Sequence, residues 1–322
     1  MERLDPGLDA LIPADAHWTV LASGMKWTEG PVWLAGGYLL FAEIPSNSIR
    51  RLVPGQPPTI FLQPSGYKGS QPYGGPEPGS NGMTVDPSGR VTVAGHAARD
   101  IFRFDSPDPH GSITILADKY QGKSLNSPND LVFGPDGSLY FSDPPYGLRK
   151  QDESDPEKQL SFNGVYRIPN AATQPAGAAP DRAHLQLLIR DLPRPNGIAF
   201  SPDGKTLYVD NTTPKFWMRY PVQPDGTLGS GSKFLDASSD TRTGAPDGMK
   251  IDVLGNIYST GPGGIWIISP SGKHLGTLRL PNSTGNLAWG GPDGQTMFVT
   301  SSGEVLSLRA KVSGLLPNHW QH

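Results

Sequence analysis

The chain has 322 residues, with 27 Lys and Arg against 30 Asp and Glu, and therefore a formal net charge of −3. It contains no basic run, so nucleic acid is not an expected partner. Cysteine is absent, which excludes disulfides, thiol nucleophiles and cysteine-based metal sites. With 40 glycines and 34 prolines, long helices have little room, because proline breaks a helix and glycine weakens it. The composition favours an all-β protein.

The N-terminal residues carry no visible targeting signal. Residues 1–16 lack a basic stretch followed by an apolar one, so they do not have the pattern of a signal peptide. No window approaches the roughly 18 consecutive apolar residues of a membrane span. We therefore expect a cytoplasmic protein with no membrane partner, or a periplasmic protein if a leader has been removed. Residues 1–16 form an extension before the first predicted strand, residues 17–23 (HWTVLAS).

A β-hairpin pattern then recurs six times along the chain. Each copy has an apolar segment, a tight turn with glycine, and a second run rich in Val, Tyr, Phe and Ile, which is typical of a hairpin. The turn glycines are Gly37, Gly89, Gly137, Gly204, Gly255 and Gly294. A third strand follows every hairpin, and a fourth follows most of them. The sixth unit lacks its fourth strand, and residues 17–23 can supply it.

Four strands per unit and six units predict an all-β six-bladed β-propeller whose ring is closed by an N-terminal strand. We expect one domain over residues 1–322. A sandwich or two smaller β domains is the alternative, but neither explains an N-terminal strand that completes the last unit. Two long segments between strands, residues 64–80 and 144–163, are predicted to be loops. Residues 171–182 are predicted to be a solvated edge loop.

Polar side chains recur at the start of the first strand of each unit, four residues before the apolar residue that precedes the turn. Five units carry Glu29, Asn81, Asn129, Asn196 and Asp247 at this position. In the sixth unit the count gives Gly285 or Asn286, depending on where one inserted residue is placed. Because the first strand of each blade lies nearest the propeller axis, these oxygens are predicted to ring one mouth of the central channel.

An oxygen ring without His or Cys suits Ca²⁺ best and Mg²⁺ or Mn²⁺ less well. Asn and Asp also begin strands through local turns, but that explanation covers neither Glu29 nor the fixed register. The second strand of each hairpin returns to the same mouth and delivers His96, Asp143, and either Asp210 or Asn211. His96 is either structural or a substrate contact, and Asp143 is either a turn carboxylate or a pocket residue.

Several segments resemble the gluconolactonase family, which includes the senescence marker protein regucalcin. They are TEGPVW (28–33), SNGMTVDPSGR (80–90), SPNDLVFGPDGSLYFSDPPYG (127–147), RPNGIAFSPDGKTLYV (194–209) and PDGMKIDVLGNIY (246–258). The resemblance runs from about Trp27 to the C-terminus, and the segment around Asn129 is the most specific. It departs from the family around His96, where Gly95 and Ala97 replace residues of a Glu-His-Gly-Asn-Arg pattern, so the sugar preference stays open.

The resemblance implies a six-bladed propeller that hydrolyses a sugar lactone with one divalent metal ion in its channel. It implies Glu29, Asn196 and Asp247 as metal ligands, Asn129 next to metal or substrate, and Asp247 as general base. We expect Ca²⁺, with Mg²⁺, Mn²⁺ or Zn²⁺ as alternatives, and polarisation of the lactone carbonyl by the metal.

Polar groups at the mouth would then bind the sugar hydroxyls, and the candidates are Asn81, Asn129, His96, Asp143 and Asn211. The expected partner is a small-molecule lactone, and the protein is expected to be a monomer or a small homo-oligomer. Two other functions remain open: a phosphotriesterase or fluorophosphatase with the same metal site, and a non-catalytic calcium-binding propeller that serves as a scaffold.

Overall fold

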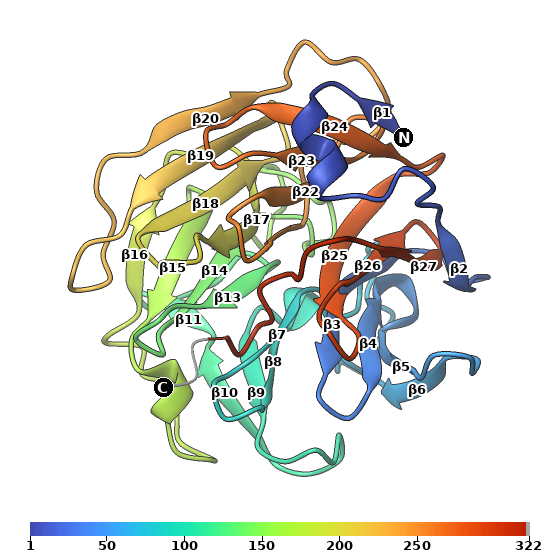
Figure 1. Cartoon of the computed structure of the whole chain (residues 1–322). Helices are drawn as coiled ribbons and strands as arrows, with labels where there is room; N and C mark the ends of the chain where they lie inside the picture. Colours follow the sequence, from blue (N-terminus) through green and yellow to red (C-terminus); the bar gives the residue numbers. More distant parts are fainter. Residues whose placement is uncertain (320–322) are drawn as a thin grey trace.

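The computed structural model describes residues 1–319, and in it six antiparallel sheets surround a central axis (Figure 1). The predicted six-bladed β-propeller is therefore confirmed. The first blade consists of β3 (Thr28–Leu34), β4 (Tyr38–Glu43), β5 (Ser48–Leu52) and β6 (Thr59–Leu62). The second consists of β7 (Met83–Val85), β8 (Val91–Ala94), β9 (Ile101–Phe104) and β10 (Ile113–Ala117). The third consists of β13 (Leu131–Phe133), β14 (Leu139–Asp143), β15 (Gly164–Ile168) and β16 (Gln186–Ile189).

The other three blades follow the same order from the axis outward. The fourth consists of β17 (Pro195–Phe200), β18 (Thr206–Asn211), β19 (Phe216–Pro221) and β20 (Ser232–Asp236). The fifth consists of β21 (Met249–Ile251), β22 (Ile257–Gly261), β23 (Gly264–Ile268), β24 (His274–Arg279) and β1 (Glu2–Arg3). The sixth consists of β25 (Thr284–Gly290), β26 (Thr296–Ser301), β27 (Glu304–Arg309) and β2 (Thr19–Ala22). Outside the blades lie the ribbon β11 (Lys119–Tyr120) and β12 (Lys123–Ser124) and the 3₁₀ turns η1 (Pro6–Ala10), η2 (Ile44–Ser46), η3 (His96–Ala98) and η4 (Ala171–Thr173).

The turn between the first two strands of every blade depends on glycine. All six predicted turn glycines have a φ between 69° and 89°, a conformation that side chains with a Cβ disfavour. The residues on either side alternate between the two faces of the sheet. Their apolar side chains form core clusters between neighbouring blades, for example Tyr140 with Val165 and Ile198.

The ring closes as predicted, through the N-terminal strand. β2 pairs antiparallel with β27, with Val20 opposite Leu306, so the outermost strand of the last blade comes from the other end of the chain. Pairing removes the free edge that β27 would otherwise expose. The indole Nε1 of Trp18 donates to the carbonyl of Arg279 at 3.1 Å and joins this strand to the fifth blade.

The N-terminal extension also takes part in the propeller, which the sequence did not indicate. β1 adds a fifth strand to the fifth blade by pairing with β24. The side chain of Asp5 accepts from the backbone N–H of Gly7 at 2.7 Å and begins η1. Leu8 and Ile12 are fully buried in the core between the fifth and sixth blades. These contacts make residues 1–12 a cover for the seam between the fifth and sixth blades.

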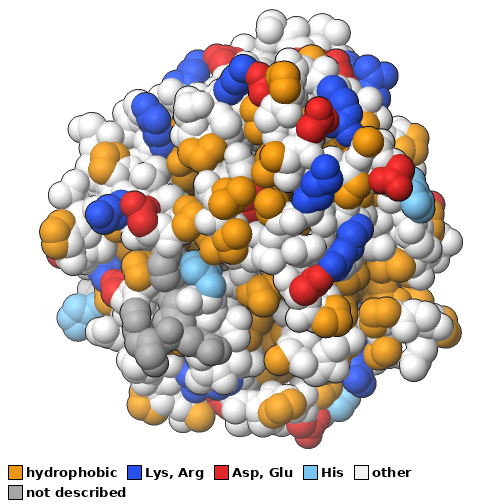
Figure 2. Space-filling view, viewed as in Figure 1, with side chains coloured by type: hydrophobic (Ala, Val, Ile, Leu, Met, Phe, Trp, Pro, Cys, Tyr) orange, Lys and Arg blue, Asp and Glu red, His pale blue; other side chains and the backbone are white. Residues whose placement is uncertain are grey.

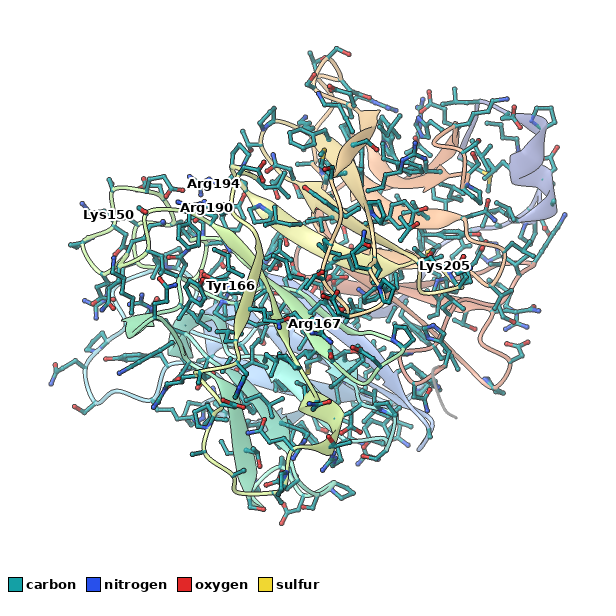
Figure 3. The ribbon with its side chains drawn as sticks, turned by 90° about the vertical axis from the view of Figure 1, so that its left-hand side faces the viewer. Lys150, Tyr166, Arg167, Arg190, Arg194 and Lys205 are labelled. Carbon is teal, nitrogen blue, oxygen red and sulfur yellow. The ribbon has the colours of Figure 1, made fainter. Side chains whose placement is uncertain are left out.

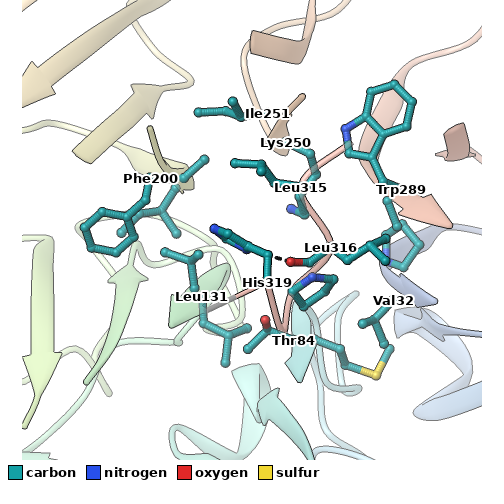
Figure 4. Close-up of a pocket in the computed structure, with 17 residues that line it drawn as sticks. Val32, Thr84, Leu131, Phe200, Lys250, Ile251, Trp289, Leu315, Leu316 and His319 are labelled. Carbon is teal, nitrogen blue, oxygen red and sulfur yellow. Dashed lines mark hydrogen bonds between the residues drawn. The ribbon is translucent and has the colours of Figure 1, made fainter. Parts of the chain in front are cut away.

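One mouth of the channel, where the glycine turns lie, is covered by the C-terminal segment. The backbone N–H of Leu315 donates to the carbonyl of Ile251 at 2.8 Å, and that of Gly314 donates to Gly294 at 3.0 Å. This segment crosses the face seen in Figure 1. Beneath it lies a cavity of about 50 Å³ (Figure 4). Side chains around this cavity come from the inner strands and the C-terminal segment, and Figure 4 labels Val32, Thr84, Leu131, Phe200, Lys250, Ile251, Trp289, Leu315, Leu316 and His319.

Acidic and basic side chains are interspersed on this same face (Figure 2). Within residues 1–319, no helix has the length and apolar character needed to cross a membrane.

We predict that Leu8→Ala destabilises the protein by about 2–5 kcal/mol, because it leaves a cavity in the core that η1 covers. Leu4→Ala is the matched control: Leu4 lies in the same segment but is 53% exposed, so its loss should stay within about 0.5 kcal/mol. Denaturant unfolding of both variants measures the difference. Equal stability of the two variants would mean that the N-terminal cover contributes nothing to the closed ring.

Candidate active site

The first strands begin at the other mouth, and there they bring the predicted polar ring together. Glu29, Asn81, Asn129 and Asn196 are each at most 3% exposed, and Asp247 is partly exposed. Backbone hydrogen bonds join neighbouring positions: Gly82 N–H to Asn129 O, and Gly248 N–H to Gly285 O, both at 2.8 Å. Gly285 therefore occupies the equivalent position in the sixth blade, and the ring holds five polar side chains rather than six.

Asn286, the other candidate of the sixth blade, lies in a second layer further into the channel. There the ammonium of Lys250 lies 3.2 Å from Asn286 Oδ1 and 3.4 Å from Asp130 Oδ2. A Cβ on Gly248 would lie 2.1 Å from Asn286 Oδ1, so glycine is required where these side chains fill the channel. Lys250 balances the charge of Asp130, and this layer forms a polar floor beneath the ring.

Three carboxyl groups at the mouth have raised pKa values: those of Glu29 and Asp247 in the ring and that of Asp210 behind it. Burial raises the pKa of Glu29 to about 8, and the charges of Asp130 and Glu77 add to the effect, although the N–H of Gly30 opposes it. Burial and the charge of Glu29 hold the pKa of Asp247 well above its ordinary value. Asp210, from the end of β18, also has a pKa raised by burial, and its Oδ1 accepts from Gly197 N–H at 3.0 Å. The mouth therefore gathers carboxyl groups whose ionised forms are disfavoured by burial and by one another.

Several buried oxygens at this mouth have no hydrogen-bond partner. They are Asn81 Oδ1, Asn196 Oδ1 and Asp210 Oδ2. The amide nitrogen of Asn196 donates to Thr212 Oγ1 at 3.1 Å, which fixes the amide and leaves its oxygen free. Buried polar atoms in native proteins are almost always satisfied, and unpaired oxygens beside repelling carboxylates are the donor set that a hard divalent cation prefers.

The residues at the mouth therefore fit a cation, and those that can hold one are Glu29, Asn196 and Asp247, with Asn129 adjacent. No group of three or more His, Cys, Asp or Glu is arranged to hold a metal in the part of the chain that the structure describes. The candidate set depends instead on two carboxylates and amide oxygens.

Asp143 and Asn211 lie at the ends of the second strands, where they support loops. Asp143 is fully buried, and its Oδ2 accepts from the backbone N–H of Asn126 at 2.8 Å. Asn211 accepts from Arg194 N–H at 2.7 Å and donates to the carbonyl of Pro214 at 2.8 Å. The structure thus brings Glu29, Asn81, Asn129, Asn196 and Asp247 together. Asn211 binds loop backbone through both ends of its amide, whereas Asp143 does so through Oδ2 and leaves its buried Oδ1 without a partner.

His96 is fully buried, and its imidazole contacts the side chain of Glu77. The distance between His96 Nε2 and Glu77 Oε2 is 2.7 Å. Glu77 belongs to the loop of residues 64–80 and was not among the predicted residues. Its other oxygen accepts from Gln151 of the second long loop at 2.9 Å. The phenolic hydroxyl of Tyr73 donates to the carbonyl of Gly147, so the two predicted loops are joined to each other beside the mouth.

Tyr146, from the second loop, and Arg194, which precedes β17, complete this wall. The guanidinium of Arg194 lies 5.4 Å from the centre of the Tyr146 ring and donates to the carbonyl of Gln151 at 2.9 Å. Burial raises the pKa of Tyr146 to about 12, and the charge of Asp247 contributes. Arg194 and Lys150 lie at the opposite end of the molecule from Lys205, which follows a glycine turn (Figure 3). The length of the two loops was the signal available in the sequence, because long loops in compact domains are often functional.

Comparison with known proteins shows which family has this sequence and fold. Residues 27–303 match the model of the SMP-30/gluconolactonase/LRE-like region. A gluconolactonase of Zymomonas mobilis is 39% identical over 97% of this chain and 86% of its own length. A solved gluconolactonase of Xanthomonas campestris superposes with a TM-score of 0.78 at 27% identity, covering 96% of this chain and 94% of its own. A calcium-binding protein, regucalcin of Agrobacterium tumefaciens, shares the fold with a TM-score of 0.69 at 20% identity, over 94% of this chain and 99% of its own.

Fold and site together define a six-bladed β-propeller with an oxygen-rich mouth at one end of its channel. Asp130, Lys250 and Asn286 fill the channel beneath this mouth. The chain belongs to the SMP-30/gluconolactonase/LRE-like family, and the resemblance found in the sequence motifs is confirmed.

We predict that Asp143→Asn stabilises the protein relative to wild type increasingly as the pH rises from 5 to 8. Burial raises the pKa of Asp143 to about 7 from 3.8, so the native state favours the protonated form. That contribution to stability is complete below about pH 4 and is lost as the pH rises through 7. Asn keeps an oxygen for the N–H of Asn126 but cannot ionise. Melting temperatures across this pH range measure the effect.

Asp152→Asn is the control, because Asp152 lies on the same loop with its pKa lowered by hydrogen bonds from Ser154. Its difference from wild type should stay constant over the same range. Parallel curves for Asp143→Asn and wild type would show that Asp143 is ionised in the native state throughout.

Proposed function

We propose that this protein hydrolyses a sugar lactone, of the gluconolactone type, to the open-chain aldonic acid. The observation that carries the proposal is the ring of buried oxygens, with unpartnered Asn81 and Asn196 oxygens beside the carboxylates of Glu29 and Asp247. The family assignment and the 39% identity to a gluconolactonase over nearly the whole chain support it. Lactone hydrolysis needs an activated carbonyl, a water and groups that move protons, and the mouth offers residues for each.

We assign Glu29, Asn196 and Asp247 to one divalent cation, with Asn129 adjacent. Their hard oxygens suit Ca²⁺ best, and Mg²⁺, Mn²⁺ and Zn²⁺ are the alternatives. When bound, such a cation would polarise the lactone carbonyl as a Lewis acid. The same charge would relieve the repulsion from Glu29 that raises the pKa of Asp247.

Asp247 is the proposed general base. Of the five ring residues it is the one that is partly exposed. Asp247 takes one proton from the water as the water oxygen bonds to the carbonyl carbon. The ring C–O bond then breaks, its electron pair stays on the ring oxygen, and that oxygen takes a proton. No nucleophilic side chain is needed.

Substrate hydroxyls are proposed to bind at the wall of the mouth. Asn81 offers an unpartnered oxygen, and the hydroxyls of Thr212 and Tyr146 lie near Asn196 and Asp247. His96 acts through Glu77, and Asp143 and Asn211 act by holding the loops that carry the wall. These are small polar contacts suited to a polyhydroxylated molecule rather than to an apolar one.

The test of the function is a panel of aldonolactones assayed on chelator-treated protein before and after reloading with Ca²⁺, Mg²⁺, Mn²⁺ or Zn²⁺. We expect hydrolysis of at least one sugar lactone, loss of activity with chelator, and recovery with one of these ions. An organophosphate triester is assayed in parallel. Hydrolysis of the triester alone would assign the site to P–O chemistry, and inactivity toward every substrate with intact metal binding would make the protein a non-catalytic scaffold.

We predict that Asp247→Asn lowers kcat by about 10²–10⁴-fold even at saturating metal, the usual contribution of a general base. The substitution keeps an oxygen for the cation but removes the proton acceptor. Kinetics at increasing metal concentration separate the two roles, because a residue that is only a ligand would regain wild-type turnover once the site is full. Asp240→Asn, an acidic residue outside the ring that pairs with Arg242, should keep wild-type kcat.

A further inference from the structure

His96 and Glu77 form a hydrogen-bonded pair beside the mouth. His96 Nδ1 lies 3.2 Å from the carbonyl oxygen of Pro128, and Nε2 lies 2.7 Å from Glu77 Oε2. A carbonyl and a carboxylate can only accept, whereas a neutral imidazole has one N–H to donate. Both partner atoms are acceptors, so both hydrogen bonds form together only when the imidazole and the carboxyl share a proton between them.

The surroundings fix the imidazole in place. His96 has a φ of 50° in η3, and its carbonyl accepts from Arg99 N–H at 2.9 Å. A Cβ on Gly147 would lie 2.7 Å from the ring carbon Cγ of His96, so the backbone of the second long loop packs directly against the ring. His96 is fully buried, and it has no direct route to solvent or to a substrate.

Glu77 provides that route. Its side chain is 21% exposed, and its loop is joined to the second long loop beside the mouth by the hydrogen bond from the Tyr73 hydroxyl to the Gly147 carbonyl. Gln151 fixes the carboxyl by donating to Oε1 at 2.9 Å, and it donates to the carbonyl of Tyr146 at 3.0 Å. A proton held by the pair therefore leaves toward the mouth through Glu77.

We propose that Glu77, supplied and positioned by His96, is the proton donor to the leaving ring oxygen of the lactone. This inference rests on the proposed lactone hydrolysis. In the second step the ring C–O bond breaks and the carbonyl re-forms, and the ring oxygen keeps the bonding electron pair and takes the proton from Glu77. Glu77 is left as a carboxylate and Asp247 holds the proton taken from water. Exchange with solvent at the open mouth returns both groups to their starting states.

The leaving group of a sugar lactone makes such a donor necessary. Its ring oxygen would otherwise depart as an aliphatic alkoxide, which is a strong base and a poor leaving group. An aryl ester departs as a phenoxide, which is far less basic and needs little protonation. A missing proton donor therefore slows the sugar lactone much more than an aryl substrate, whereas a missing structural contact slows both alike.

The experiment compares glucono-1,5-lactone with dihydrocoumarin and phenyl acetate on Glu77→Gln and wild type, both loaded with metal. We expect Glu77→Gln to lower kcat on the sugar lactone by about 10²–10⁴-fold, with a change below about fivefold on the aryl substrates. His96→Asn, which keeps a residue that tolerates a positive φ, should show the same selectivity for the leaving group with a smaller loss. The ratio of rates on one preparation is independent of the fraction of protein that is folded.

Glu157→Gln is the matched control, because Glu157 is an exposed carboxylate on the second long loop that pairs with Arg149. It should keep wild-type rates on all substrates. If wild type accepts neither aryl substrate, Glu77→Ala is assayed on the sugar lactone with added acetic acid, which restores turnover if the lost group is a proton donor. Wild-type kcat in Glu77→Gln, equal losses on both substrate classes, or no rescue would overturn the assignment. Inactivity of wild type toward every lactone would instead overturn the proposed function itself.

Discussion

The mutual repulsion of carboxylates buried at one mouth of the channel is the constraint on which the site depends. Burial is the largest cause of the raised pKa values of Glu29, Asp247 and Asp210, and a neighbouring carboxylate adds to each. That neighbour is Asp130 for Glu29 and for Asp210, whereas it is Glu29 for Asp247. A chain gains nothing in stability from such a cluster unless something positive compensates it. Lys250 provides that compensation for Asp130 in the layer below. Lys250 also lowers the pKa of Glu29, but the amide oxygens of Asn81 and Asn196 remain unpartnered beside the carboxylates, and this supports the cation that we propose.

The propeller concentrates these groups because six first strands converge on one axis. Each strand contributes one residue to the ring, with a polar side chain in five of the six blades, and one residue to the layer beneath it. The second residue is glycine in four blades. A Cβ on Gly30 would lie 2.2 Å from the carbonyl oxygen of Asn81, and one on Gly197 would lie 2.2 Å from that of Asp247. Glycine therefore lets neighbouring strands approach closely enough for their ring side chains to share one site. The sheets therefore determine where the ring side chains lie, and the convergence of the strands on a narrow axis buries these side chains.

The sequence was sufficient to predict the propeller, the closing strand and five ring positions, because each follows from a repeat with a fixed register. In the sixth blade, spacing allowed both Gly285 and Asn286, and only the hydrogen bond from Gly248 to Gly285 distinguishes them. Glu77 was not predictable, because it lies in a loop without periodicity and reaches the mouth through contacts with His96 and Gln151. Leu8 and Ile12 were also missed: the isolated turn η1 has no repeat to align with, and its burial depends on the seam between the fifth and sixth blades.

The segments outside the matched family region bear on how a substrate can reach the site. Residues 27–303 carry the ring, while the N-terminal cover and the C-terminal segment lie beyond them. The C-terminal segment crosses one mouth of the channel, and Asp130, Lys250 and Asn286 fill the layer below the ring. Within residues 1–319, passage along the axis is therefore blocked from that side. Substrate and product must use the same mouth, beside the joined loops of residues 64–80 and 144–163. A residue of those loops that touches the reacting bond, as we propose for Glu77, would then meet every substrate on its way in and every product on its way out.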